Sequence, residues 1–118
     1  PPPWRDEAGG LAEAAHVLAT STLAPDAEAV AMAIRQVFPL ERWAQAEAIA
    51  WCESRYRPGA IGKAAERGIF QISGIHLIRI LRMGYTWDDM LHAQPNVEIA
   101  YAIWQEQGWA PWSCSSTE

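Results

Sequence analysis

The fold of this chain is decided between residues 40 and 73, a stretch that reads LERWAQAEAIAWCESRYRPGAIGKAAERGIFQIS. Its first part predicts a helix over residues 40–53, because Trp43, Ala46 and Ala50 recur at helical spacing. Glu53 takes the fourth position on that face. Desolvation disfavours the charged form of a carboxylate, so a carboxyl group placed there tends to keep its proton near neutral pH. Glu53 is therefore a candidate general acid, the alternative being a helix-end glutamate turned to solvent.

Helix signals recur along the rest of the chain. Proline and glycine mark a loop at residues 56–67, with room for a small hairpin. Thr86 and Asp89 resemble the two ends of a capping box. Start and stop residues predict further helices between Pro25 and Pro39, between Ser73 and Gly84, and between Pro95 and Gly108. We therefore predict a mostly α fold.

Composition narrows the class of protein. The chain has 118 residues, half of them hydrophobic, which is enough for one domain with a single core. Its formal net charge is −5 and it has no basic stripe, so nucleic acid is not an expected partner. No apolar run is long enough to span a membrane. Neither a nucleotide fingerprint nor a metal-ligand cluster is present, so no cofactor or metal is expected.

The N-terminal part differs from the rest. Residues 1–25 are rich in proline, alanine and glycine, which predicts a linker or tether with one short helix over residues 11–19. The first residue is Pro1 and no signal peptide is visible. We therefore expect a processed chain or a piece of a longer polypeptide.

Two cysteines, Cys52 and Cys114, are the only ones in the chain. They are either two buried thiols or a disulfide that ties the end of the Glu53 helix to the C-terminal tail. We favour the disulfide, because the short polar tail otherwise has little to hold it. Such a bridge stabilises the fold by about 4 kcal/mol on the chain-entropy model and implies an extracytoplasmic place of work.

Four blocks of the sequence together resemble a known family. They are AIAWCESRYRPGA at residues 48–60, GIFQI at 68–72, PNVEIA at 95–100 and GWAPWS at 108–113. This set resembles the lysozyme-like superfamily, especially its lytic transglycosylase branch and its phage and actinobacterial members, over about residues 28–114. The resemblance implies a mostly α lysozyme-like fold with a substrate cleft and at most a small β-hairpin, and makes residues 26–118 the catalytic domain. It also implies cleavage of the β-1,4 bond between N-acetylmuramic acid (MurNAc) and N-acetylglucosamine (GlcNAc) in peptidoglycan.

The resemblance gives Glu53 the role of general acid and base. In a lytic transglycosylase the sugar's own 6-hydroxyl attacks and a 1,6-anhydro end forms, which requires one carboxylate. In a hydrolytic muramidase a second carboxylate supports the attack of water. Glu66 is the candidate second carboxylate, because it stands two residues before Gly68, where animal-type lysozymes carry an aspartate. Alternatively, Glu66 is a solvated loop residue between Lys63 and Arg67. We favour the transglycosylase.

Further substrate-binding positions follow from the same resemblance. Gln71 matches a family glutamine that faces the cleft; the other interpretation is an amide that ties the loop to the helix. Ser73 stands where many transglycosylases have Met, and Gly62 where many have Ser. Tyr101 is a candidate substitute for a late family tyrosine whose sequence block is missing here.

Tryptophan is abundant, with seven residues in the chain. Indole rings stack on sugars, but large aromatic side chains also fill cores. We assign Trp43 and Trp104 to the core. Trp51, Trp109 and Trp112 are either core residues or contacts near the cleft.

Two classes of function remain open. The first is a peptidoglycan-cleaving enzyme, favoured because Glu53 and Gln71 stand in their expected places. The second is a weakly active glycan-binding or structural module of a phage particle, joined to a larger polypeptide or tail assembly through the N-terminal segment. Either way we expect peptidoglycan as the partner and an extracytoplasmic location, whether secreted, bound to the cell wall or associated with a virion.

Overall fold

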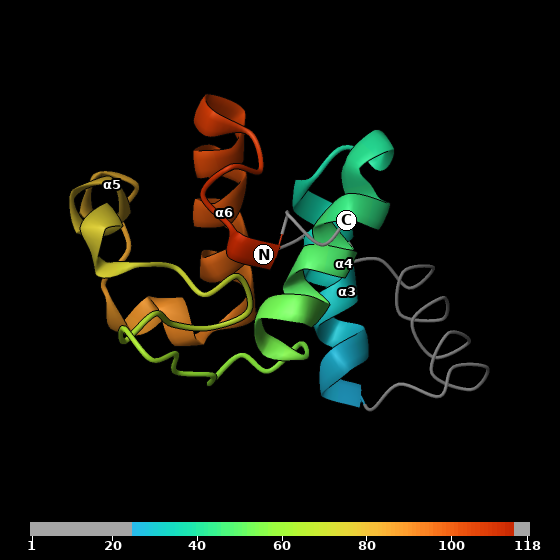
Figure 1. Cartoon of the computed structure of the whole chain (residues 1–118), viewed down its shortest axis with the longest axis horizontal. Coiled ribbons are helices and arrows are strands. Elements are labelled where there is room, and N and C mark those ends of the chain that lie inside the picture. The colour runs from blue at the N-terminus through green and yellow to red at the C-terminus, as the bar shows by residue number, and fades with distance from the viewer. Residues whose placement is uncertain (1–24, 115–118) are drawn as a thin grey trace.

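The computed structural model describes residues 25–114, and these form a mostly helical structure, which confirms the predicted fold class (Figure 1). The described elements are α3 (Pro25–Val37), η1 (Leu40–Arg42), α4 (Trp43–Ser54), η2 (Gly74–His76), α5 (Leu77–Arg82), η3 (Asp88–Leu91) and α6 (Ala93–Gln107), where η marks a short 3₁₀ turn. The predicted linker over residues 1–25 and the helix over residues 11–19 lie outside the described residues, Pro25 excepted.

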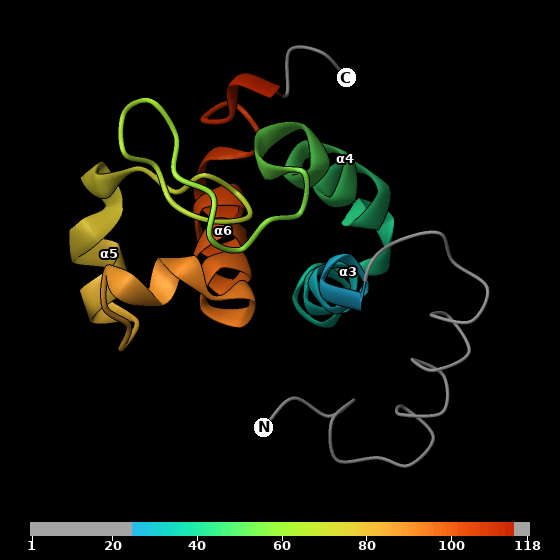
Figure 2. The ribbon, with the colours of Figure 1, turned by 90° about the horizontal axis from the view of Figure 1, so that it is seen from below.

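Helix α6 is the central element. In two views at right angles it lies between α5 on one side and the α3–α4 pair on the other (Figures 1 and 2). Helix α3 packs against both α6 and α4. The core between them contains fully buried Ile34, Ile49, Phe70 and Ile103, one from each of α3, α4, the segment before α5, and α6. The loop that follows α4 is therefore anchored in the same core as the helices.

Three helix starts differ from the sequence-based expectation; one is that of α5, which begins at Leu77 after η2 and not directly after Ser73. The helix predicted over residues 40–53 is divided into η1 and α4, and α4 begins at Trp43. The last helix begins at Ala93 and not at Pro95. Proline is compatible with this register because amides in the first turn of a helix have no intrahelical acceptor to lose.

The connection from α4 to α5 has hairpin-like pairing but no strand within residues 25–114. Its only regular pairing within residues 25–114 is two isolated antiparallel bridges, Ile61 with Arg67 and Arg67 with Ile72. The segment ends at Ser73, whose hydroxyl accepts a hydrogen bond from the amide of Ile75 at 3.3 Å and so caps η2 as predicted.

The Thr86–Asp89 capping box is also present. The amide of Thr86 donates to Asp89 Oδ2 at 2.7 Å, and the amide of Asp89 donates to Thr86 Oγ1 at 3.3 Å. Each side chain thus satisfies the other residue's backbone N–H at the start of η3.

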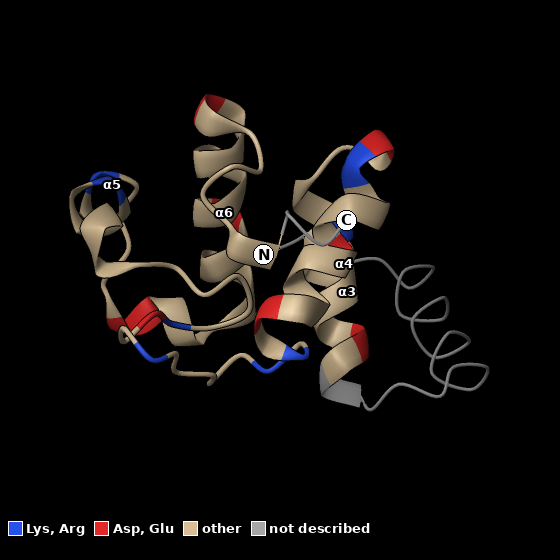
Figure 3. Ribbon diagram, in the orientation of Figure 1, with Lys and Arg blue, Asp and Glu red and all other residues tan. Residues whose placement is uncertain are grey.

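Charges of both signs are interspersed along the described ribbon, with no continuous basic stripe (Figure 3). Among residues 25–114 no helix combines the length and the apolar character needed to cross a membrane. In the same residues no group of three or more His, Cys, Asp or Glu side chains is placed to hold a metal ion.

Candidate functional site

Glu53 lies in the last turn of α4, at the edge of the core. Ala46 and Ala50 on its face of the helix are fully buried, while Glu53 itself is half-buried. Burial raises the pKa of the Glu53 carboxyl above its usual 4.5, the amide of Cys114 opposes this by a hydrogen bond, and the charge of Glu66 raises the pKa further. A carboxyl group in this setting holds its proton to a higher pH than a solvated glutamate, as a general acid requires.

A disulfide joins Cys52, the residue before Glu53, to Cys114. The two Cα atoms are 6.0 Å apart and the bridge spans a sequence separation of 62. The backbone amide of Cys114 donates a hydrogen bond to Glu53 Oε2 at 3.4 Å. The C-terminal segment is thus linked covalently to the residue beside Glu53 and contacts the Glu53 carboxylate directly.

Glu66 stands on the loop that faces the end of α4 and lies close enough to Glu53 for its charge to act on that carboxyl group. Its Oε1 accepts a hydrogen bond from the amide of Ala64 at 3.0 Å, and the residue is half-buried. The flanking cation Arg67 turns elsewhere, since its Nη1 pairs with Asp88 at 2.9 Å. Glu66 therefore sits at the candidate site and has no ion pair with Arg67.

Gly62 brings the side chains of Glu66 and Gln71 together. A Cβ atom at Gly62 would lie under 3.0 Å from both Glu66 Oε1 and Gln71 Oε1, so these oxygens fill the space that a side chain there would use. The amide nitrogen of Gln71 donates to the carbonyls of Ala60 at 3.2 Å and Gly68 at 3.0 Å. Gln71 thus ties the loop together through its nitrogen, while its oxygen lies beside the Glu66 carboxylate.

Asn96, a buried residue of α6, holds this loop in place. Its Oδ1 accepts from the amide of Phe70 at 2.9 Å, and its Nδ2 donates to the carbonyls of Arg67 and Met90 at 2.9 Å each. Gly68 (φ 78°) passes so close that a Cβ there would overlap Asn96 Nδ2 and Met90 O. The sequence showed Asn96 only as a member of the PNVEIA block and did not predict this role, because a buried amide has no distinct sequence signal.

Two of the proposed substrate-binding tryptophans take part in core packing. Trp112 is 5% exposed, and its indole nitrogen donates to the carbonyl of Phe70 at 2.8 Å. Trp109 stacks on Phe38 with ring centroids 5.6 Å apart and donates to Gln45 Oε1 at 3.1 Å. Gln45 is in the first turn of α4, about 12 Å from Glu53 along the helix axis.

The other aromatic candidates are spread over the molecule. Tyr101 of α6 is half-buried and meets the ring of Phe38 edge-on at 5.1 Å. Trp51 is 43% exposed and lies beneath the guanidinium of Arg55, 5.3 Å from the ring centroid. Trp43 and Trp104, both expected in the core, pack against it while partly buried.

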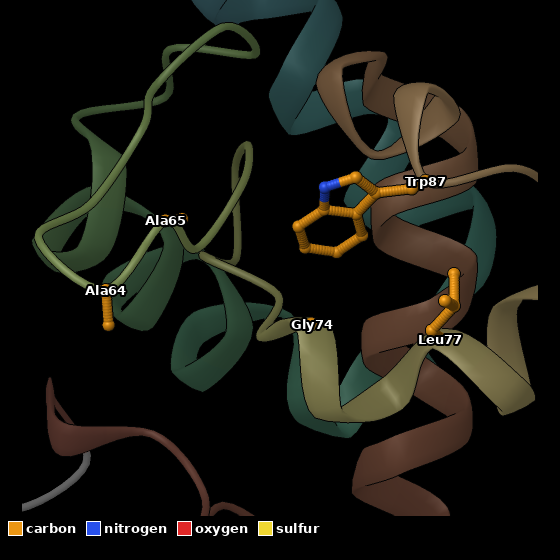
Figure 4. Close-up of a pocket in the computed structure, with 5 residues that line it drawn as sticks. All are labelled: Ala64, Ala65, Gly74, Leu77 and Trp87. Carbon is orange, nitrogen blue, oxygen red and sulfur yellow. The ribbon is translucent and has the colours of Figure 1, made fainter.

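A pocket that sequence analysis did not anticipate lies beside the Glu66 loop (Figure 4). It has a volume of about 230 Å³ and is lined by Ala64, Ala65, Gly74, Leu77 and Trp87. The Trp87 ring projects into the space between the loop and the start of α5 (Figure 4), and the Arg67 guanidinium lies 4.7 Å from its centroid. The lining is apolar, and Ala65 immediately precedes Glu66 in the chain.

One comparison with known proteins, a scan of family models, found a match. A family model described as "Transglycosylase SLT domain" matches residues 41–108, which is more than half of the chain and includes Glu53, Glu66 and Gln71. No curated protein and no solved structure matches the chain. The match confirms the resemblance drawn from the sequence: this chain belongs to the family of transglycosylase SLT domains, a lysozyme-like family that acts on peptidoglycan.

Proposed function

We propose that this protein is a lytic transglycosylase that cleaves the MurNAc–GlcNAc β-1,4 bond of peptidoglycan, with Glu53 as its general acid and base. The observation that carries the proposal is the environment of Glu53. The carboxyl group is half-buried at the end of α4 and has a raised pKa, inside the segment that matches the family. Glu53 therefore keeps its proton to a higher pH than a solvated glutamate, and its exposed part can contact a ligand.

The reaction needs only one carboxyl group. Glu53 donates its proton to the glycosidic oxygen, the bond to C1 of MurNAc breaks, and positive charge develops at C1. The Glu53 carboxylate then accepts the proton of the 6-hydroxyl as that oxygen attacks C1. A 1,6-anhydro ring closes, the proton is back on Glu53, and no water is consumed.

Glu66 supports this reaction electrostatically. Its negative charge favours the protonated form of Glu53 before cleavage. The same charge stabilises a positive centre at C1 during cleavage. Gln71, whose oxygen adjoins Glu66, is proposed to help orient the sugar, and Ser73 to contact it from the end of the same segment.

Hydrolysis is the second candidate, and the position of Glu66 is the observation that favours it. A second carboxylate that interacts with Glu53 is what a muramidase uses to support the attack of water. The two reactions differ in their products, since hydrolysis adds one water and leaves a reducing end. The proposal for Glu66 in either reaction rests on its closeness to Glu53.

The apolar pocket at Trp87 is proposed as a binding subsite next to the cleaved bond. Ligand sites are typically apolar surfaces with a few polar groups beside them, and the pocket adjoins the Glu66 loop in this way. The apolar faces of N-acetylated sugars, including the acetamido methyl group, fit an apolar wall with an indole ring. Tyr101, Trp109 and Trp112 are proposed to act mainly through packing.

One experiment tests the reaction. Purified protein is incubated with peptidoglycan, and the soluble fragments are analysed by mass spectrometry. We expect fragments with anhydro ends, each lighter by one water than the corresponding reducing-end fragment. Reducing ends alone would replace the transglycosylase by the muramidase, and no release of fragments would contradict both enzymes.

The place of work is proposed to be extracytoplasmic. The Cys52–Cys114 disulfide supports an oxidising compartment, and the substrate of the family is the cell wall.

A further inference from the structure

The contact between Cys114 and Glu53 carries an inference beyond the proposed function. Cys52 precedes Glu53 on α4, and the disulfide brings Cys114 to the same end of the helix. We propose that the bridge makes Cys114 a positioning residue for the general acid, because it holds the Cys114 backbone N–H against one oxygen of the Glu53 carboxyl group. This inference deepens the proposed function and rests on it.

The geometry selects which oxygen carries the proton. The Cys114 amide donates to Glu53 Oε2, so this oxygen must offer a lone pair. In the protonated acid the hydrogen is then directed to Oε1, which leaves Oε1 free to protonate the glycosidic oxygen. At 3.4 Å the bond is long. Such bonds commonly shorten when the reacting complex forms.

The same amide also assists the second half of the reaction. Once Glu53 has given up its proton it is an anion in a half-buried place, and a backbone N–H donor stabilises that anion. Three effects thus set the pKa of Glu53: burial raises it most, the Cys114 amide lowers it, and the charge of Glu66 on the facing loop raises it. Burial and the charge of Glu66 therefore favour the protonated form of Glu53, whereas the Cys114 amide favours the ionised form.

The bridge is suited to this role because it fixes the end of a segment that Trp112 already attaches to the core. The indole of Trp112 is buried and bonded to the carbonyl of Phe70, which attaches the chain to the core two residues earlier. The disulfide then sets the course of residues 113 and 114 relative to α4. Cys52 is exposed and Cys114 is buried, and reduction of the bond between them removes this constraint. The acid is consequently coupled to the redox state of the bridge.

The direct test uses the intact, oxidised protein and needs no substrate. The ¹⁵N and ¹H chemical shifts of the Cys114 amide are followed against pH in the wild type and in Glu53→Gln. We expect the Cys114 amide signal to move as Glu53 ionises, and to stay in place in Glu53→Gln. The amide of Trp112, which donates to the carbonyl of Trp109 at 3.0 Å, is the control signal. A Cys114 signal that is flat across the Glu53 titration overturns the proposal.

A second test measures the pH profile of activity. In the Cys52→Ala/Cys114→Ala variant we expect lower activity. We also expect the basic limb, the fall in activity at the high-pH side of the profile, to move to higher pH by up to about one unit. The size follows because two or three backbone donors lower a carboxyl pKa by roughly two units. Dithiothreitol, which breaks the S–S bond to two thiols and is itself oxidised, should displace the wild-type limb in the same direction and leave the variant unchanged.

A structural control separates positioning from stability. Ile99→Ala opens a cavity in the buried face of α6 and lowers stability without touching the bridge, so it should leave the basic limb in place. If the double cysteine variant loses activity while its limb stays where the wild-type limb is, the bridge acts on stability alone. If Glu53→Gln keeps its activity while the Cys114 signal titrates, the proposed function fails and the contact stands.

Discussion

The carboxylate of Glu66 occupies the space in which a side chain on Gly62 would begin: Glu66 Oε1 lies under 3.0 Å from the position of a Cβ on Gly62. Gln71 Oε1 also lies under 3.0 Å from that Cβ position. Glycine at residue 62 therefore allows two polar side chains to meet at the end of α4, beside Glu53.

Gly62→Ala tests this relationship. We expect a loss of about 1–3 kcal/mol in the free energy of unfolding, because the added methyl group must displace two side chains. Glu66 is held through its Oε1, which accepts from the amide of Ala64, and Gln71 through its nitrogen, which donates to the carbonyl of Ala60. Activity should fall as well, since Glu66 and Gln71 move. Denaturant unfolding and turnover of peptidoglycan are the measurements. Gly59→Ala is the matched control: nothing lies within 4 Å of its Cβ position, so stability should change little, and equal losses in the two variants would contradict the argument.

Glu53→Gln removes the proton donor and keeps the shape of the side chain. We expect glycan cleavage to fall by a factor on the order of 10² to 10⁴, with the circular dichroism spectrum unchanged. Glu41→Gln alters an exposed carboxylate ahead of α4 and should retain activity. Near-full activity of Glu53→Gln would remove Glu53 from the mechanism.

The pH dependence follows from the raised pKa of Glu53. The general acid is active when protonated, so activity should be lost as pH rises through a pKa above the usual 4.5. Because folding raises this pKa, the group stabilises the fold fully below the unfolded value, and this contribution is lost as pH rises through the folded value. Rate and melting temperature measured against pH in the wild type and in Glu53→Gln should show both effects, and only the wild type should have them.

Glu66→Gln separates the two proposed reactions. Removal of the charge should lower the pKa of Glu53 and move the basic limb of the activity profile to lower pH. In a transglycosylase the loss at the optimum should stay within about tenfold, the effect of one pKa unit, and anhydro ends should persist. A loss as deep as that of Glu53→Gln, together with reducing ends in the wild-type digest, would establish the muramidase.

Asn96→Ala should damage the fold and the site together. Three backbone groups, on Phe70, Arg67 and Met90, lose their partner in a buried place, and we expect a cost of about 3 kcal/mol or more. Gln94→Ala, which removes one half-buried bond to Glu98, is the control on the same helix and should cost less. Thermal unfolding of both variants measures the difference, and similar melting temperatures would contradict the anchoring role.

Leu77 and Ile78, two exposed apolar side chains of α5, test whether the pocket at Trp87 binds substrate. Leu77→Ala removes part of the pocket lining and should raise KM about fivefold, roughly 1 kcal/mol of lost apolar contact, with kcat little changed. Ile78→Ala, 60% exposed on the same helix and not part of the lining, should leave KM as it is. Trp87→Phe should show a weaker form of the Leu77→Ala effect. Equal KM values for the two α5 variants would leave the pocket without a role in binding.

Local sequence alone predicted the helical class, the helix ends and the turn at Ser73, and it singled out Glu53 as the candidate acid. These features depend on residues close together in the chain: apolar spacing places Glu53 on the buried face of α4, and capping side chains act within three or four residues. The starts of α4, α5 and α6 were exceptions. For α6 the reason is that a proline is compatible with more than one position in the first turn.

The assembly of the site depends on contacts between residues far apart in the chain. The Cys114 amide reaches Glu53 from 61 residues away, Asn96 holds a loop that precedes it by 26 residues, and Gly62 is required by side chains that meet across a turn. The same holds for the aromatic residues, since a tryptophan fits a core or a sugar equally well by composition. Trp112 is buried, whereas Trp87 lines a pocket, because the fold brings different neighbours to each ring.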